Sequence, residues 1–195
     1  MIIGITGGTG CGKTTALEVI RSLGGTVIDC DAVYHGLLKN DKALLEEIGS
    51  RFPNTVTNGV LDRKALGSTV FADPEALLAL NAMTHPAVKA AVLKMLTPCS
   101  ALAAIDAIAL FEGGLSDLCN VTVAVTAPTE DRIMRLMARE GISRAYAEKR
   151  IAAQKPNAYF SSLCDYTLEN TGTEADFRAK CLAFFRRQDI IKENT

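Results

Sequence analysis

A glycine-rich run near the N-terminus constrains the fold of this chain more than any other feature. Residues 7–14 read Gly-Gly-Thr-Gly-Cys-Gly-Lys-Thr, which matches the pattern G-x-x-x-x-G-K-[ST]. The run follows the apolar segment 1–6, which we expect to form a buried strand, and it precedes a helical pattern over residues 15–23. A strand, a glycine-rich turn and a helix in this order predict a phosphate-binding loop.

The chemistry expected of this loop comes from its backbone and from its last residues. Glycines let N–H groups converge on phosphate oxygens, and the following helix adds the positive end of its dipole. We expect Lys13 to contact the β- and γ-phosphates of ATP, and the Thr14 hydroxyl to ligate the accompanying Mg²⁺. The residues expected to bind ATP here are Gly8, Thr9, Gly10, Cys11, Gly12, Lys13, Thr14 and Thr15. The alternative is a glycine-rich turn that binds nothing.

The identity of the base is indicated by a missing motif. The sequence contains no Asn-Lys-x-Asp run after a late strand, which a guanine-specific switch normally carries. This absence argues against a regulatory GTPase and favours ATP.

Short apolar segments alternate with helical patterns along the chain. We expect strands over residues 1–6, 26–30, 102–111, 120–125 and 166–169, each followed by turn or cap residues. Strands separated by helices predict an α/β protein with a three-layer fold, in which helices flank a mostly parallel five-stranded sheet.

The helical stretches carry clear start signals. Asp73-Pro74-Glu75 predicts an N-cap followed by a first-turn proline, and Pro86 is expected to open a further helix. A polar, basic helical block is expected from Pro128 to about Gln154. The last helix is expected to begin near Thr173 with a capping box and to bury an aromatic face, and the chain after Arg187 is expected to fray.

These elements suggest three parts of the chain. We expect a nucleotide-binding core over residues 1–31, 99–127 and 160–195. Residues 32–98 are expected to form a helical acceptor domain, and residues 128–159 a lid.

Composition excludes several classes of function. The 195 residues fit one compact domain with small excursions, and the formal net charge of −1 gives no basic footprint for nucleic acid. The six cysteines form no C-x-x-C pair, only two histidines are present to complete a metal site, and we expect reduced, mostly buried thiols in a cytosolic protein. No window approaches the length of a transmembrane helix, so we expect a soluble protein without a membrane partner.

Carboxylates follow two of the expected strands. Asp29 and Asp31 lie two residues apart at the end of the second strand, so both side chains are expected on one face. Acids placed there could orient metal-bound water or accept the proton of an attacking hydroxyl, or they could only cap the helix that begins at Ala32. Glu112 ends the third expected strand, where it could serve metal or substrate or be a solvated surface group.

Taken in this order, these features resemble the dephospho-CoA kinase family over most of the chain. The resemblance is carried by Gly4–Gly8, Val27–Asp31, Leu61–Arg63, His85–Pro86, Leu110–Glu112, Arg135–Arg139, Arg150–Gln154 and Asn170. It implies a core like that of nucleoside monophosphate kinases, an acceptor-binding helical domain, a mobile lid that carries arginines, and transfer of the γ-phosphoryl of ATP to the ribose 3′-hydroxyl of dephospho-CoA.

The resemblance also implies roles for single residues. Asp31 would act as the base on the 3′-hydroxyl, and Arg139 would reach the triphosphate from the lid. Arg135 and Asn170, with Gly172 nearby, would belong to the ATP side. The acceptor side would consist of Asp31, Leu61, Asp62, Arg63, His85, Phe111 and Glu112. Without the resemblance, the favoured interpretations are a capping or packing histidine for His85 and a solvated surface group for Arg63.

Two positions depart from the family pattern. Ile108 stands where the family usually has proline, which could relax the end of the strand that places Glu112. Arg132 stands where glutamine is expected and would add positive charge near the nucleotide. We expect Arg132, Arg135 and Arg139 to share one helix face; the alternative is a solvated stripe paired with Asp131 or Glu140.

Two other functions fit the sequence. One is a kinase of another small acceptor, such as a nucleoside monophosphate or shikimate, on the same core. The other is an ATP-dependent switch or assembly factor whose hydrolysis drives a protein partner. The sequence leaves the oligomeric state open.

Overall fold

The computed structural model describes residues 1–97 and 102–187, which form two compact units. Unit 1 contains residues 1–28, 102–111 and 115–187, and unit 2 contains residues 29–97 and 112–114. Cys99, the expected domain boundary at 98–99 and the expected frayed tail after Arg187 lie outside the described residues. The three-part division of the sequence remains a prediction; residues 128–159 lie within unit 1.

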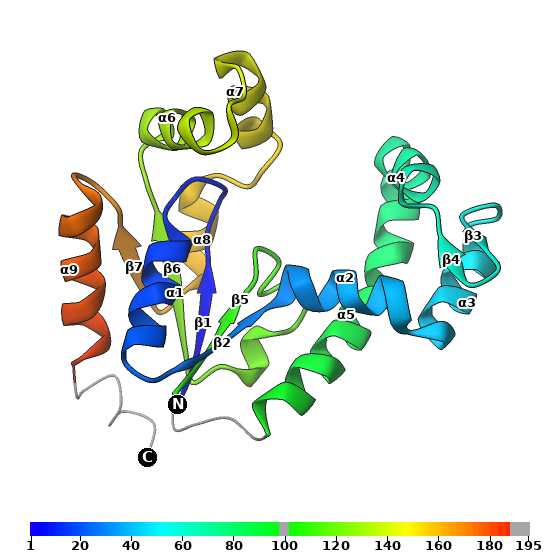
Figure 1. The fold of residues 1–195 in the computed structure, drawn as a ribbon, viewed down its shortest axis with the longest axis horizontal. Coiled ribbons are helices and arrows are strands. Elements are labelled where there is room, and N and C mark those ends of the chain that lie inside the picture. The colour runs from blue at the N-terminus through cyan, green and yellow to red at the C-terminus, as the bar shows by residue number, and fades with distance from the viewer. Residues whose placement is uncertain (98–101, 188–195) are drawn as a thin grey trace. The chain divides into compact units, whose positions relative to one another are not determined.

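Unit 1 is built on a five-stranded sheet in the order β2-β5-β1-β6-β7 (Figure 1). Its strands are β1 (Ile2–Thr6), β2 (Thr26–Asp29), β5 (Ala103–Asp106), β6 (Val121–Thr126) and β7 (Tyr166–Glu169). The pairs β1–β5, β1–β6 and β6–β7 are parallel. These parallel pairs confirm the expected α/β fold with a mostly parallel five-stranded sheet. The connections between the paired strands contain helices, as parallel pairing requires.

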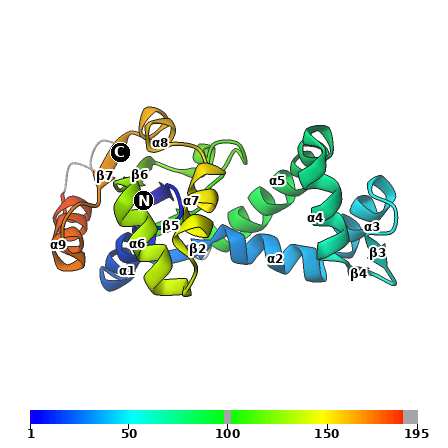
Figure 2. The same ribbon diagram turned by 90° about the horizontal axis from the view of Figure 1, so that it is seen from above.

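The apolar strands of unit 1 are buried between helices. The helices are α1 (Lys13–Ser22), the 3₁₀ turn η1 (Ser116–Leu118), α6 (Thr129–Glu140), α7 (Arg144–Ala152), α8 (Asn157–Leu163) and α9 (Glu174–Phe185). Alternate residues of β1 and β6, such as Ile5 and Val123, pack with α1 and α9 in one hydrophobic cluster. Figure 2 shows α8 on the other face of the sheet. The expected capping box at Thr173 and Asp176 is present, and α9 buries its aromatic residues as expected.

Unit 2 is mostly helical. It contains α2 (Cys30–Asn40), α3 (Lys42–Arg51), the short hairpin β3 (Val56–Thr57) and β4 (Val60–Leu61), α4 (Arg63–Ala72) and α5 (Pro74–Leu96). Leucines, valine and Phe52 from these elements form a separate hydrophobic core. Asp73 caps α5 by accepting a hydrogen bond from the Glu75 N–H, and Pro74 takes the first helical position, as expected.

The expectation that Pro86 opens a helix is wrong. Pro86 lies inside the 23-residue helix α5. The buried residues of α5 continue at four-residue spacing on both sides of the proline, at Ala76, Leu80, Thr84, Val88 and Val92. Because a proline removes only one backbone hydrogen bond when its neighbours hold the helix, packing of this stripe keeps the helix continuous.

Two other boundaries differ from expectation. The third strand ends at Asp106 rather than near residue 111, and residues 108–114 form turns. The basic block after Pro128 is two helices, α6 and α7, because Gly141 adopts the left-handed conformation with φ 65° and ends α6.

The expectation that no segment approaches a membrane span is also wrong. Helix α5 is long and apolar enough to cross a membrane by length and composition, with a mean hydropathy of 1.3. This is weak evidence, because core helices of soluble proteins meet the same criteria, and the N-terminal part of α5 packs Ala76 and Leu80 into the core of unit 2.

Candidate active site

The phosphate loop joins the end of β1 to the start of α1. Gly12 has φ 101°, a left-handed conformation that glycine adopts without strain. A Cβ atom at Gly12 would lie 2.2 Å from Asn170 Nδ2, so a larger residue does not fit there. The loop therefore has the tight, backbone-lined form that the motif predicts.

Lys13 and Thr14 are placed for phosphate chemistry. The Lys13 ammonium donates a hydrogen bond to the Gly7 carbonyl at 3.0 Å, which holds the side chain back across the loop. Thr14 is exposed in the first turn of α1, and Thr15 is partly buried behind it. Cys11 is fully buried, and burial raises the pKa of its thiol, so this residue contributes its backbone rather than a reactive thiolate.

Asn170 and Arg135 support the loop from one side. Asn170 is buried at 4% exposure, and its Nδ2 donates to the Cys11 carbonyl at 2.9 Å. Its Oδ1 accepts from Arg135 Nη2 at 3.2 Å, and Arg135 Nη1 donates to the Gly10 carbonyl at 3.3 Å. Both polar atoms of the Asn170 side chain are therefore engaged within the protein.

Arg132 supports the loop from the next turn of α6. Its Nε donates to the Thr9 carbonyl at 2.8 Å, and its Nη2 donates to Gln154 Oε1 at 3.0 Å. Arg132 is only 3% exposed, so its positive charge is buried against the loop instead of lying on an open helix face. The positive charge of Arg132 thus lies against the loop, in a packed position.

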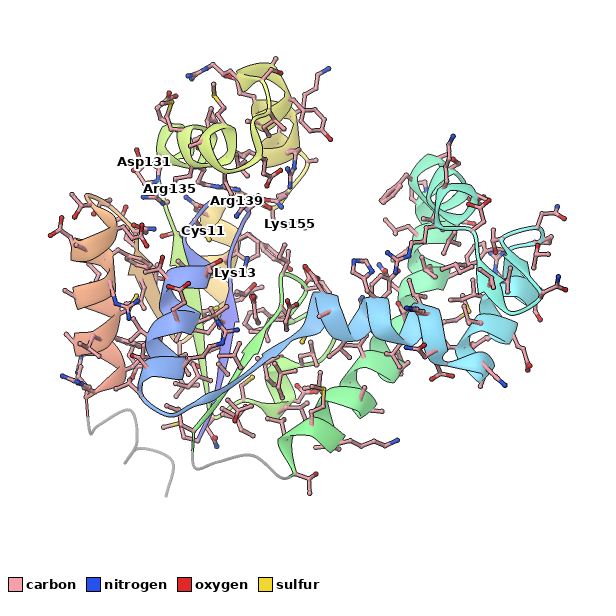
Figure 3. The ribbon with its side chains drawn as sticks, in the orientation of Figure 1. Cys11, Lys13, Asp131, Arg135, Arg139 and Lys155 are labelled. Carbon is pink, nitrogen blue, oxygen red and sulfur yellow. The ribbon has the colours of Figure 1, made fainter. Side chains whose placement is uncertain are left out.

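Arg139 does not share these contacts. Its guanidinium pairs with Glu140, which also pairs with Arg150, and the Arg139 side chain is 58% exposed. This is the pairing that the sequence analysis gave as the alternative for the helix face. Figure 3 shows Arg135 and Arg139 on the side of α6 that faces the loop, above Cys11 and Lys13, with Lys155 nearby in the segment between α7 and α8.

Helices α6 and α7 form a small body of their own. Ile133, Leu136 and Ala147 make a separate cluster with neighbouring apolar residues. Ser143 caps α7, and Arg144 pairs with Glu130 across the two helices. The two helices therefore pack together around a small core of their own.

Asp29 and Asp31 do not form a pair on one strand, contrary to expectation, because only Asp29 belongs to β2. Strand β2 ends at Asp29, and Cys30 is already the first residue of α2. Asp29 Oδ1 accepts a hydrogen bond from the Ala32 N–H at 3.0 Å, so Asp29 is the N-cap. Asp31 lies exposed in the first turn of α2 and has no cap to make.

Glu112 also sits differently from expectation. It follows β5 by six residues, in a turn of unit 2, rather than ending the strand. Its carbonyl oxygen lies 3.1 Å from His85 Nδ1, so these two predicted acceptor residues are brought together. Phe111 directly precedes Glu112 in the same run of turns and belongs to unit 1. Ile108 lies in the turns after β5, and its carbonyl accepts a hydrogen bond from Thr6 Oγ1, so it does not end the strand that was expected to place Glu112.

Leu61 and Arg63 line a pocket of about 260 Å³ in unit 2. Asp62, between them, caps α4 through the N–H groups of Lys64 and Ala65, and this cap aims Arg63 from the first position of the helix. Burial raises the pKa of the Tyr34 phenol at the pocket wall, an effect that the Arg63 charge opposes. The remaining lining is mostly apolar and comes from α2, α4 and α5: His35, Leu38, Leu66, Gly67, Val70, Phe71, Leu77, Leu80 and Asn81.

Several residues at the site were missed by the sequence analysis. Asp106 ends β5 beside Ile5 of β1, which places a carboxylate on the strand next to the one that leads into the loop. Gln154 and Asn157 bond to the loop or to Arg132. The position of Asp106 at a strand end was a readable signal. Gln154 belongs to the stretch Arg150–Gln154 that carries the resemblance, but nothing local marks it or Asn157 as a partner of the loop.

The fold and loop together define a P-loop nucleotide-binding protein of the small-molecule kinase type. The family model described as dephospho-CoA kinase matches residues 1–176. A dephospho-CoA kinase of Thermus thermophilus is 40% identical over 177 residues, which cover 90% of this chain and 86% of that protein. The chain therefore belongs to the dephospho-CoA kinase family.

Solved structures agree with this assignment. The dephospho-CoA kinase from Campylobacter jejuni aligns with a TM-score of 0.68 and 30% identity over 100% of this chain and 98% of its own. A shikimate kinase from Bacteroides thetaiotaomicron aligns with a TM-score of 0.54 and 16% identity over 96% of this chain and 99% of its own, which shows the shared fold alone.

Proposed function

We propose that the protein transfers the γ-phosphoryl group of ATP to the ribose 3′-hydroxyl of dephospho-CoA, giving coenzyme A and ADP. The observation that carries this proposal is a complete phosphate loop in a chain that belongs to the dephospho-CoA kinase family along 1–176. A kinase for a nucleoside monophosphate or shikimate would share the loop but is not favoured by the family match. No observation favours a protein-driven switch.

The nucleotide side of the reaction uses unit 1. The loop N–H groups and the first turn of α1 bind the phosphates, and Lys13 exchanges its bond to the Gly7 carbonyl for phosphate oxygens. Mg²⁺, when bound with ATP, would supply charge neutralisation at the phosphates. The exposed Thr14 hydroxyl and the Asp106 carboxylate are oxygen donors of the kind that this ion prefers, and they stand at the start of α1 and the end of β5.

The acceptor side uses unit 2. We assign Asp31 as the residue that accepts the proton of the 3′-hydroxyl, since Asp29 is occupied as a helix cap and Asp31 is exposed. The apolar pocket with Arg63 at its wall suits an acceptor that has an extended, weakly polar arm and a phosphate group. His85 and Glu112 are proposed as further acceptor contacts.

The helix pair α6–α7 is proposed to act as the lid. Exclusion of water is needed because an open site would transfer the phosphoryl group to water. Among the described residues, Arg139 makes one ion pair, with Glu140, and its own side chain is 58% exposed, so this pair exchanges readily for a triphosphate. We expect it to leave Glu140 for the γ-phosphate when the lid closes.

The proposed partners are small molecules, and the proposed location is the cytoplasm. ATP and dephospho-CoA are the proposed partners, and a net charge of −1 gives no reason to expect nucleic acid. The five described cysteines are free thiols, which is consistent with a reducing cytoplasm.

An acceptor comparison tests the proposal. ADP release would be coupled to a spectroscopic readout with dephospho-CoA, nucleoside monophosphates, shikimate or no acceptor, and the product analysed by ³¹P NMR. We expect turnover with dephospho-CoA at least about a hundredfold above every other acceptor, with the new phosphate on the 3′-oxygen. Comparable turnover with another acceptor, or phosphorylation at the 2′-oxygen, would overturn the assignment.

A further inference from the structure

The tip of the phosphate loop is held by two side chains that are distant in sequence. Thr9 donates its backbone N–H to Gln154 Oε1 at 2.8 Å and accepts from Gln154 Nε2 at its hydroxyl at 2.7 Å. Its carbonyl accepts from Arg132 Nε at 2.8 Å. All three polar groups of Thr9 are therefore bonded to Arg132 or Gln154.

The orientation of these two side chains is fixed by further bonds. Arg132 Nη2 donates to Gln154 Oε1 at 3.0 Å, so this oxygen accepts two hydrogen bonds while the amide nitrogen donates to Thr9. Arg132 Nη1 lies 3.4 Å from Asn157 Oδ1, and Asn157 Nδ2 donates to the Ala127 carbonyl at 2.7 Å. Ala127 and Asn157 stand just before α6 and at the start of α8, so the network is anchored at both ends of the α6–α7 segment.

Burial makes this contact unusual for a charged residue. Arg132 is 3% exposed, and its hydrogen bonds go to neutral oxygens rather than to a carboxylate. Burial lowers the pKa of its guanidinium. A Cβ atom on Gly8 would lie 2.4 Å from Arg132 Nη2, so the guanidinium packs directly against the loop backbone. A buried cation with neutral partners is costly unless its position serves another purpose.

We propose that Arg132 and Gln154 are positioning residues that set the conformation of the phosphate loop at Thr9 before ATP binds. This inference rests on the proposed function only in taking ATP as the ligand. The loop grips the phosphates in the ground state and in the transition state alike. A looser loop tip therefore weakens phosphate binding equally in the ground state and in the transition state. This raises the KM for ATP and leaves kcat unchanged.

A residue with a merely structural role would give a different result. Its loss would lower the melting temperature and the fraction of folded enzyme, and the remaining enzyme would keep its affinity for ATP. The split between KM and kcat therefore separates a positioning role from a structural one.

The experiment uses the full chain with Gln154→Leu, Arg132→Met, Arg132→Lys and the double variant Arg132→Met with Gln154→Leu. Arg144→Gln is the matched control, because Arg144 lies on the same helix pair and its ion pairs within residues 1–97 and 102–187 are with the exposed acids Glu130 and Glu148. ATP affinity is measured by calorimetric titration without acceptor, and kcat and KM are then measured for ATP and dephospho-CoA. Because the titration contains nucleotide alone, failure of the acceptor assignment would leave its result intact.

We expect Gln154→Leu and Arg132→Met each to weaken ATP binding about tenfold, the effect of losing one or two hydrogen bonds. The change in kcat and in the KM for dephospho-CoA should be less than about twofold. The double variant should weaken binding by much less than the product of the single effects, because both residues act through Thr9. Arg132→Lys keeps the charge without the planar fork and should behave like Arg132→Met.

Three results would overturn the proposal. They are unchanged ATP affinity in Gln154→Leu, recovery of affinity in Arg132→Lys, and full multiplicativity in the double variant. If Arg132→Met does not fold, the variant Thr9→Val tests the proposal instead. It removes the hydroxyl that accepts a hydrogen bond from Gln154 Nε2 while keeping the side-chain volume. It should weaken ATP binding a few-fold, and an unchanged affinity would count against the assignment.

Discussion

Replacing Asn170 by alanine should destabilise the protein in the absence of any ligand. The Asn170 side chain donates to the Cys11 carbonyl at 2.9 Å and accepts from Arg135 at 3.2 Å, at a site with 4% exposure. In the variant, the Cys11 carbonyl loses its side-chain donor. Asn170 is expected from the resemblance to belong to the ATP side, and these bonds make it a support of the loop as well.

The size of the effect follows from the lost bonds. Two hydrogen bonds contribute about 1 kcal/mol each, and a buried carbonyl without its donor adds about 1 kcal/mol or more. The free energy of unfolding should thus fall by about 3 kcal/mol. For a chain of this length, that corresponds to a melting temperature lower by roughly 6–12 °C.

Differential scanning calorimetry without nucleotide measures this change. Asn170→Asp should behave similarly, because it keeps the size but replaces the donor to Cys11 with a carboxylate oxygen. Thr171→Ala is the control, since Thr171 is exposed beside it. A direct adenine ligand would instead leave the ligand-free melting temperature unchanged and alter the preference for ATP over GTP. That outcome would refute the reasoning.

Four other predictions concern single side chains. Lys13→Ala should abolish transfer and leave the melting temperature nearly unchanged, since the Lys13 ammonium donates to a loop carbonyl and adds little to the core; near-normal turnover in a coupled assay would remove the basis of the nucleotide assignment. Asp31→Asn should lower single-turnover transfer by about a hundredfold or more, whereas Asp29→Asn should be mild because asparagine also caps helices; the reverse order would exchange the two roles. Arg139→Ala should depress turnover and reduce the hydrogen-exchange protection that MgATP confers on residues 128–154, with no change in ligand-free stability; unchanged turnover and protection would exclude a lid role. Burial raises the pKa of Cys119 to about 12, so its thiolate is scarce at pH 8 and iodoacetamide should label it only after unfolding; rapid labelling of the native protein would contradict this.

The sequence was sufficient where a local signal has one physical meaning. The phosphate loop, the cap at Asp73 and the capping box at Thr173 were predicted because each depends on residues within a few positions of one another. The sheet followed from alternating apolar and helical segments. The hairpin turn at Asn58-Gly59 was equally readable, because the pair Asn-Gly favours a tight hairpin turn, and both residues do have positive φ. It was nevertheless missed.

The sequence was insufficient where tertiary packing overrides a local preference. Pro86 reads as a helix start, yet the buried stripe on either side of it keeps α5 continuous. Asp29 and Asp31 read as a pair on a strand, but the Asp29 cap starts α2 one residue after the strand ends, so the two side chains take different roles. In both cases the outcome depends on what the segment packs against.

Arg132 shows why a site residue can be identified and still be misinterpreted. In the sequence, Arg132 is one of three arginines at helical spacing. The spacing correctly predicts that Arg132 and Arg135 lie on one helix face, and in the structure both donate to loop carbonyls. The helical spacing does not predict the role of Gln154, which lies 22 residues further along the chain. The Gln154 amide accepts a hydrogen bond from the Arg132 guanidinium and, like Arg132, bonds to Thr9. Because the contacts of α6 with the loop join segments more than 120 residues apart, they exist only once β1 and β6 are neighbours in the sheet. The helix pair that is proposed to close over ATP is thus bonded to the loop that is proposed to hold it, and a movement of α6 should alter the loop at Thr9 before any lid arginine reaches a phosphate.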